Sequence, residues 1–164
     1  ASRGLRVFDS ESAIRMLCEG SRRVALDLLL AMQNRYEPSI FVRKWVHIPA
    51  WSEFRCFMKN RELVGISQYD CKSLGYCRKI EENAFTILEA IRGFSEVFRQ
   101  SSHIEDVVFD VYWSENRAGK VTLIEINPFM PLTDGCLFDW TAQDDFDGSL
   151  RFIGPNGGTS RKMV

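Results

Sequence analysis

The alternation of apolar and polar residues in the second half of the chain predicts a β-hairpin. Residues 107–113 and 121–129 are apolar segments that each contain one acidic residue, and a short polar stretch separates them. Side chains alternate between the two faces of a strand, so Glu125 and Asn127 should point in the same direction. Asp110 on the neighbouring strand would complete a group of two carboxylates and one amide.

Three further strands are expected earlier in the chain. Residues 53–58 and 63–69 have a strand pattern on either side of a polar turn at residues 59–61, which predicts a second hairpin. The apolar run over residues 40–46, which follows Pro38, predicts a separate strand.

Helical periodicity marks three other segments. Apolar residues recur every three or four positions between residues 80 and 100, which predicts the longest helix and its buried face. Two shorter helices should precede the strands. One runs from a cap at Asp9 or Ser10 to Glu19, and the other covers residues 21–33.

The order of these elements predicts an α+β fold. Hairpin connections make the sheet mostly antiparallel, with the helices packed on one face. Composition changes after residue 140, where acidic residues precede a Gly-rich stretch at 154–158. We therefore predict a compact region over residues 1–140 and a flexible tail over residues 141–164.

Bulk composition restricts the class of protein. The 164 residues are 45% hydrophobic, which is sufficient for one compact domain with its own core. A net charge of −1 gives no basis for direct nucleic-acid or membrane binding, and the longest apolar stretch, residues 24–32, is too short to span a bilayer. No secretory signal opens the sequence, and the five scattered cysteines fit reduced thiols rather than a zinc site. We therefore expect a cytoplasmic location.

The oxygen donors of the hairpin predicted over residues 107–129 suit a hard cation. Asp110, Glu125 and Asn127 resemble a magnesium site, because proteins usually hold Mg²⁺ with one or two carboxylates together with substrate phosphates. Arg55 could clamp phosphate oxygens from a neighbouring strand. The alternative is a charge-paired network in which the two acids bind only Arg55 or Lys120. The residues alone leave both hypotheses open.

A basic and aromatic cluster, Arg43, Lys44 and Trp45, lies at the end of the strand predicted over residues 40–46. Its backbone could meet the edge of an adenine while Lys44 or Trp45 covers the ring. The alternative is a sheet edge that is protected by charge. Neither histidine of the chain lies in a setting that would activate a serine or cysteine, so no nucleophile or general base stands out.

Six segments together resemble the cell-division-cycle protein 123 family, in the order and nearly the spacing of that family. They cover residues 40–140, whereas residues 1–39 match only loosely. The segments are FVRKW at 41–45, EFRCF at 53–57, GISQ at 65–68, VFDVY at 108–112, LIEINPF at 123–129, and TD at 133–134 with LF at 137–138.

The resemblance implies an ATP-grasp fold, of which this chain would be the C-terminal half, with ATP and magnesium as ligands. It implies an assembly factor for eukaryotic translation initiation factor 2 that acts through the gamma subunit. It also assigns residues: the metal ligands are Asp110, Glu125 and Asn127, Arg55 lies near the phosphates, and the adenine is bordered by Arg43, Lys44, Trp45 and Val46.

Three departures from the family pattern bear on these assignments. Glu125 stands where the family usually has aspartate, Tyr69 replaces an arginine in a Ser-Gln-Arg-Asp motif, and the N-terminal half of the ATP-grasp fold is missing. We therefore expect a fragment whose site needs that missing half as a partner. The alternatives are an ATP-grasp carboxylate–amine ligase, which holds magnesium in the same way, and a degenerate relative that binds no nucleotide. Because no nucleophile or base stands out, we favour a nucleotide-dependent assembly factor over an enzyme.

Overall fold

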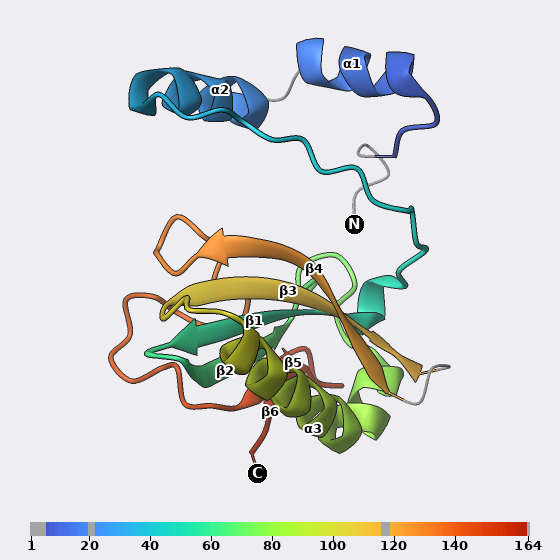
Figure 1. The fold of residues 1–164 in the computed structure, drawn as a ribbon. Coiled ribbons are helices and arrows are strands. Elements are labelled where there is room, and N and C mark those ends of the chain that lie inside the picture. The colour runs from blue at the N-terminus through green and yellow to red at the C-terminus, as the bar shows by residue number, and fades with distance from the viewer. Residues whose placement is uncertain (1–5, 20–21, 116–118, 164) are drawn as a thin grey trace. The chain divides into compact units, whose positions relative to one another are not determined.

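The computed structural model describes residues 6–19, 22–115 and 119–163 (Figure 1). The chain divides into two compact units, Ala1–His47 and Ile48–Val164, and each is described by itself. Three α-helices and a six-stranded sheet make up the regular part of the described structure. This composition confirms the predicted α+β class.

The first unit contains α1 (Ser10–Cys18) and α2 (Arg22–Asn34), close to their predicted bounds. Asp9 caps α1, because its carboxylate accepts a hydrogen bond from the Ser12 N–H at 2.7 Å. In return, the Asp9 N–H donates to the Ser12 hydroxyl at 3.2 Å. This reciprocal arrangement satisfies backbone groups that the first turn of a helix leaves without partners.

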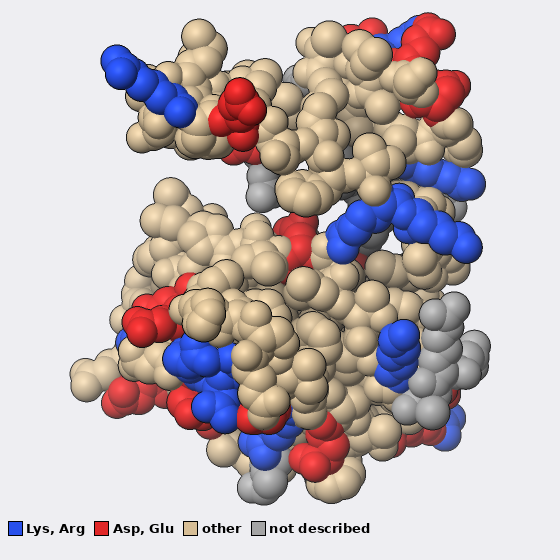
Figure 2. Space-filling model, in the orientation of Figure 1, with Lys and Arg blue, Asp and Glu red and all other residues tan. Residues whose placement is uncertain are grey.

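The surface of α2 is apolar around most of its circumference. Uncharged side chains cover most of the visible face of the first unit (Figure 2). The exposed residues of α2 include Leu26, Leu28, Leu29, Leu30 and Met32. These exposed apolar side chains give the first unit an unusually apolar surface.

The prediction of a strand over residues 40–46 is wrong. Residues 36–49 form neither a helix nor a strand, and Phe41 is 87% exposed. The apolar residues of this segment favour an extended backbone, but a strand also needs a neighbour that pairs with its N–H and C=O groups. No strand of the described sheet pairs with this segment.

The second unit is built on a sheet with the strand order β4-β3-β1-β2-β5-β6. All neighbouring strands are antiparallel except β2 and β5, which are parallel. The two predicted hairpins, β1–β2 and β3–β4, are confirmed. The bounds, after a 3-10 turn at Ala50–Ser52, are β1 (Glu53–Lys59), β2 (Glu62–Gln68), β3 (Val107–Ser114), β4 (Lys120–Pro128), β5 (Leu150–Ile153) and β6 (Thr159–Lys162).

One face of the sheet is covered by α3 (Arg78–Ser101), the helix predicted over residues 80–100 (Figure 1). Its buried apolar residues recur at helical spacing and are Ile80, Ala84, Ile87, Leu88 and Ile91. They share a core with alternate strand residues, among them Phe54, Cys56, Phe109 and Val111. Neither α3 nor any other described helix has the length and apolar composition of a membrane span.

The opposite face is covered in part by the segment that follows β4. The ring of Phe138 lies 5.2 Å from that of Phe57 in β1 and stacks on Phe146 at 5.1 Å. Gly65 of β2 lies under this ring, because a Cβ at Gly65 would be only 2.7 Å from Cζ of Phe138. Glycine therefore allows Phe138 to pack directly on the strand.

The prediction of a flexible tail over residues 141–164 is wrong for the described residues. β5 and β6 extend the sheet, and Leu150 and Phe152 are buried in the core that includes α3. The acidic residues of this region suggested a solvated segment. Two of them, Asp145 and Asp147, instead form ion pairs with Arg151 of β5.

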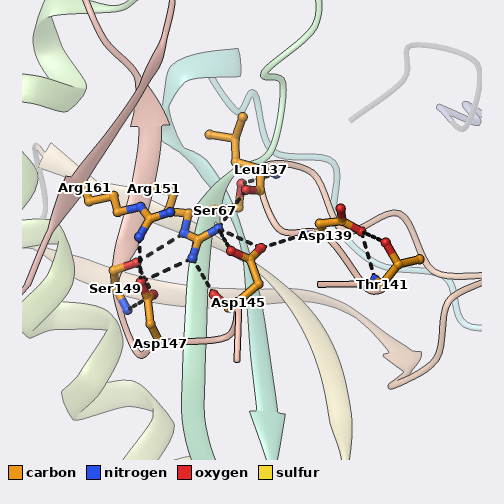
Figure 3. Close-up of polar contacts among 9 residues, drawn as sticks. All are labelled: Ser67, Leu137, Asp139, Thr141, Asp145, Asp147, Ser149, Arg151 and Arg161. Atoms are coloured by element: carbon orange, nitrogen blue, oxygen red, sulfur yellow. Dashed lines mark hydrogen bonds and ion pairs between the residues drawn. The ribbon is translucent and has the colours of Figure 1, made fainter. Parts of the chain in front are cut away.

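Arg151 fastens the segment between β4 and β5 to the sheet (Figure 3). This residue is 2% exposed, and its Nη1 donates to both carboxylate oxygens of Asp145 at 2.8 Å and to the Leu137 carbonyl at 3.1 Å. Nη2 lies 3.2 Å from Asp147, and the guanidinium carbon lies 3.9 Å from the centre of the Phe138 ring. Removing one member of such a buried ion pair leaves the others without compensation.

Arg151→Met should lower the free energy of unfolding by about 3 kcal/mol, because it leaves the carboxylate of Asp145 without its cation. Arg161→Met is the matched control. Arg161 also lies 3.2 Å from Asp147 but is half exposed, so its loss should cost no more than about 1 kcal/mol. Urea denaturation of both variants measures the difference, and equal losses would contradict the role assigned to Arg151.

Candidate functional site

One polar residue from each strand lies in a row across the face of the sheet opposite α3. These residues are paired directly in neighbouring strands, and side chains paired in this way lie on the same face. From β4 to β6 the row consists of Glu125, Asp110, Arg55, Ser67, Arg151 and Arg161. Glu125 of β4 and Asp110 of β3 form the acidic end of this row, and Arg55 of β1 is the cation at its centre.

Arg55 and Asp110 form a bidentate ion pair at the centre of the row. Nε of Arg55 donates to Oδ1 of Asp110 at 2.8 Å, and Nη2 donates to Oδ2 at 2.8 Å. Both residues are buried. Burial lowers the pKa of Arg55, but the hydrogen bonds and charge of Asp110 outweigh it and keep the pKa above its ordinary value. The guanidinium is therefore fixed both in charge and in orientation.

The acidic end of the row holds more negative charge than Arg55 can balance. Burial raises the pKa of Asp110, and the adjacent Glu125 raises it further, although Arg55 acts in the opposite direction. Oε1 of Glu125 accepts a hydrogen bond from the Asn127 amide at 2.9 Å, which confirms that these two side chains share a face. Two carboxylates beside one arginine favour the uptake of a proton or a cation.

Tyr69 lies directly after β2 and covers the guanidinium of Arg55. The guanidinium carbon is 4.9 Å from the centre of the Tyr69 ring, a cation–π contact. The backbone N–H of Tyr69 donates to the Glu53 carbonyl at 3.1 Å, which holds the residue against β1. Burial raises the pKa of Tyr69, so its hydroxyl stays neutral and adds no charge to the site.

Asp134, in the segment after β4, completes the surroundings of Arg55. Its backbone carbonyl accepts a hydrogen bond from Nη1 of Arg55 at 2.9 Å. Its carboxylate accepts hydrogen bonds from Lys72 Nζ and from the Cys136 N–H, each at 2.9 Å. The turn that presents Asp134 requires Gly135, since a Cβ at that position would collide with the Phe138 carbonyl oxygen.

The structure brings together four of the eight residues predicted for the site: Arg55, Asp110, Glu125 and Asn127. The other four belong to the first unit, whose position relative to the second is not determined. Within that unit, Trp45 is partly exposed, and the guanidinium carbon of Arg6 lies 5.7 Å from the centre of its ring. An adenine contact for Arg43, Lys44, Trp45 and Val46 stays a prediction.

Sequence reasoning missed two residues of the site, Lys72 and Asp134. Each belongs to a loop, where no periodic pattern indicates the direction of a side chain. The one available signal was Thr133–Asp134, a short segment of the family resemblance. The Thr133 hydroxyl donates to the Pro128 carbonyl at 2.7 Å and thereby anchors this loop to the end of β4.

The donor set fits magnesium better than zinc. Among the described residues, no group of three or more His, Cys, Asp or Glu side chains is arranged around a common point. Each carboxylate oxygen of Asp110 accepts one hydrogen bond from Arg55. An ionised carboxylate has about four lone-pair sites, so Asp110 retains acceptor capacity for a metal ion. Asp110, Glu125 and the amide oxygen of Asn127 would supply the few protein oxygens that Mg²⁺ requires beside water and phosphate.

A double-mutant cycle tests the ion pair. Arg55→Met alone and Asp110→Leu alone should each lower the free energy of unfolding by about 3–5 kcal/mol, because each leaves a buried charge without its partner. The double variant should be more stable than the sum of the two losses predicts, by about 2 kcal/mol or more. Urea denaturation of the four proteins measures this coupling. Additive losses would show that the two charges are solvated independently.

The D123 family model matches residues 9–154 of this chain. The translation initiation factor eIF2 assembly protein of Xenopus tropicalis is 39% identical over 107 residues, which cover 65% of this chain and 30% of the relative. Cell division cycle protein 123 of Yarrowia lipolytica is 32% identical over 124 residues, which cover 76% of this chain and 32% of the relative. The chain thus spans about a third of the length of these relatives.

The solved structure of Cdc123 from Schizosaccharomyces pombe has a similar fold. Its TM-score is 0.65 at 29% sequence identity, and the alignment covers 82% of this chain and 55% of that chain. The four clustered site residues, Arg55, Asp110, Glu125 and Asn127, all lie within the matched family range. The family match covers most of the chain and confirms the resemblance found in the motifs: this chain belongs to the D123, or Cdc123, family.

Proposed function

We propose that this chain supplies the magnesium-binding part of an ATP site, and that the family-length protein is an assembly factor for translation initiation factor eIF2. The acidic end of the polar row carries the proposal. Asp110 and Glu125 are direct neighbours, Asn127 adds an amide, and Arg55 contributes a single positive charge. A divalent cation at this point would balance the charge that Arg55 leaves uncompensated.

Arg55 is positioned to bind the phosphates of the same nucleotide. Of its five N–H donors, the described hydrogen bonds use Nε–H, one N–H of Nη1 and one N–H of Nη2. A second N–H therefore remains on each of Nη1 and Nη2. Such N–H groups can donate to phosphate oxygens.

The role of the family-length protein is proposed from its relatives. Proteins of Xenopus tropicalis and Schizosaccharomyces pombe that this chain resembles are named eIF2 assembly proteins. We extend that role to this chain and propose that it acts through the gamma subunit of eIF2. In this proposal the fold is an ATP-grasp fold that is completed by a region outside this chain, and the adenine is bordered by Arg43, Lys44, Trp45 and Val46.

The competing function is a purely structural network. One observation favours it: both carboxylate oxygens of Asp110 already accept hydrogen bonds from Arg55. The two hypotheses differ in how the folded state responds to ligand. A ligand that binds only the folded state raises its stability by RT ln(1 + [L]/Kd), whereas a structural network gains nothing from Mg-ATP.

Asn127→Ala should weaken Mg-ATP binding by at least about tenfold in isothermal titration calorimetry, because it removes a metal ligand but keeps the Arg55–Asp110 pair. Asn83→Ala is the matched control, since the Asn83 amide donates to the Lys79 carbonyl on the exposed side of α3. It should bind as the wild type does. All three proteins are made at family length, so that the region that completes the proposed fold is present. A family-length wild type that binds no Mg-ATP, or an Asn127→Ala variant with unchanged affinity, would contradict the proposal.

The partner assignment predicts a preference among the subunits of eIF2. The immobilised chain should bind purified gamma subunit more tightly than purified alpha or beta subunit in biolayer interferometry. Preferential binding to alpha or beta would refute the assignment to gamma. Binding to none of the three would refute the assignment of eIF2 as the partner of this region.

A further inference from the structure

We propose that Lys72 is a second cation of the nucleotide site and binds the phosphate chain beside Arg55. This inference rests on the proposed function, since it assigns a further residue to the same site. The observation behind it is that Arg55 and Lys72 both donate hydrogen bonds to Asp134. Asp134 accepts Arg55 Nη1 on its backbone carbonyl and Lys72 Nζ on its carboxylate, each at 2.9 Å.

The loop that carries Lys72 is anchored at its base. Gln68, at the end of β2, is fully buried, and its amide nitrogen donates to the Asp70 carbonyl at 3.0 Å and to the Gly75 carbonyl at 2.9 Å. Its amide oxygen accepts a hydrogen bond from the Ile153 N–H at 3.0 Å, which ties the loop to β5. The backbone on both sides of Lys72 is therefore held close to the sheet.

The side chain of Lys72 is nevertheless accessible. It is 78% exposed, and its partner carboxylate on Asp134 is 56% exposed. Ion pairs between exposed side chains are weak and are readily exchanged for other partners. A lysine on a flexible four-carbon stem can therefore leave Asp134 and follow an anion, while the loop backbone stays in place.

Charge balance gives the reason that a second cation is needed. The charge of Arg55 is largely offset by the buried carboxylate of Asp110. Tyr69, which covers Arg55, contributes no charge. A polyphosphate carries more negative charge than one magnesium ion neutralises, so a mobile ammonium at the edge of the site would supply the missing positive charge as a point charge.

The test compares two lysines that form similar exposed ion pairs on opposite faces of the sheet. Lys72→Met should weaken Mg-ATP binding by roughly fivefold at low ionic strength in isothermal titration calorimetry, and Lys72→Arg should restore most of the affinity. The effect should shrink at high salt, because exposed charges are screened. The control is Lys79→Met, since Lys79 pairs with Glu115 at 3.1 Å and lies over Trp51 on the side of α3. It should leave the affinity unchanged.

Asp134→Asn separates phosphate binding from a structural role of the ion pair. It removes the carboxylate that competes for Lys72 but keeps the backbone carbonyl that holds Arg55, so binding should be unchanged or tighter. If Asp134→Asn weakens binding as much as Lys72→Met, the pair is structural and the inference fails. If the wild type binds Mg-ATP and Lys72→Met binds equally well, the inference also fails while the proposed function stands. If the family-length wild type binds no Mg-ATP, the proposed function itself fails.

Discussion

The bidentate contact between Arg55 and Asp110 is the interaction on which the second unit depends. Both residues are buried on adjacent strands, so each charge is tolerated only because the other is present. The alignment that joins them also places Glu125 beside Asp110 and Ser67 beside Arg55. A shift of one residue in the pairing of these strands would turn the polar side chains of the shifted strand into the core that α3 covers. One ion pair thus constrains the register of the sheet and the geometry of the site together.

The parts of the fold that were predicted correctly are those with a sustained period. The hairpins β1–β2 and β3–β4 alternate over seven to nine residues per strand, and α3 repeats its apolar face over 24 residues. β5 and β6 have only four residues each, too few for a period to emerge from an acidic and Gly-rich region. The segment over residues 40–46 has the composition of a strand, but strand formation depends on a partner that local sequence does not specify.

The same distinction between periodic strands and irregular loops applies to the residues of the site. Arg55, Asp110, Glu125 and Asn127 were predictable because alternation along a strand fixes the face of each side chain. Asp134 and Lys72 come from loops, and their approach to Arg55 depends on turns, a glycine and buried hydrogen bonds that no periodic pattern reveals. Strands therefore supply the groups whose direction is fixed by the sheet, among them the buried Arg55 and Asp110, and a loop supplies Lys72, which is exposed and able to exchange partners.

The central claim is that the acidic end of the polar row holds a metal ion. The most direct test is anomalous diffraction from crystals of this chain grown with Mn²⁺ in place of Mg²⁺ and a non-hydrolysable ATP analogue. The account predicts a manganese peak within coordination distance of Asp110, Glu125 and Asn127, with Arg55 still bound to Asp110. A peak elsewhere, or crystals in which nucleotide is bound but these three residues have no metal ion between them, would contradict the claim.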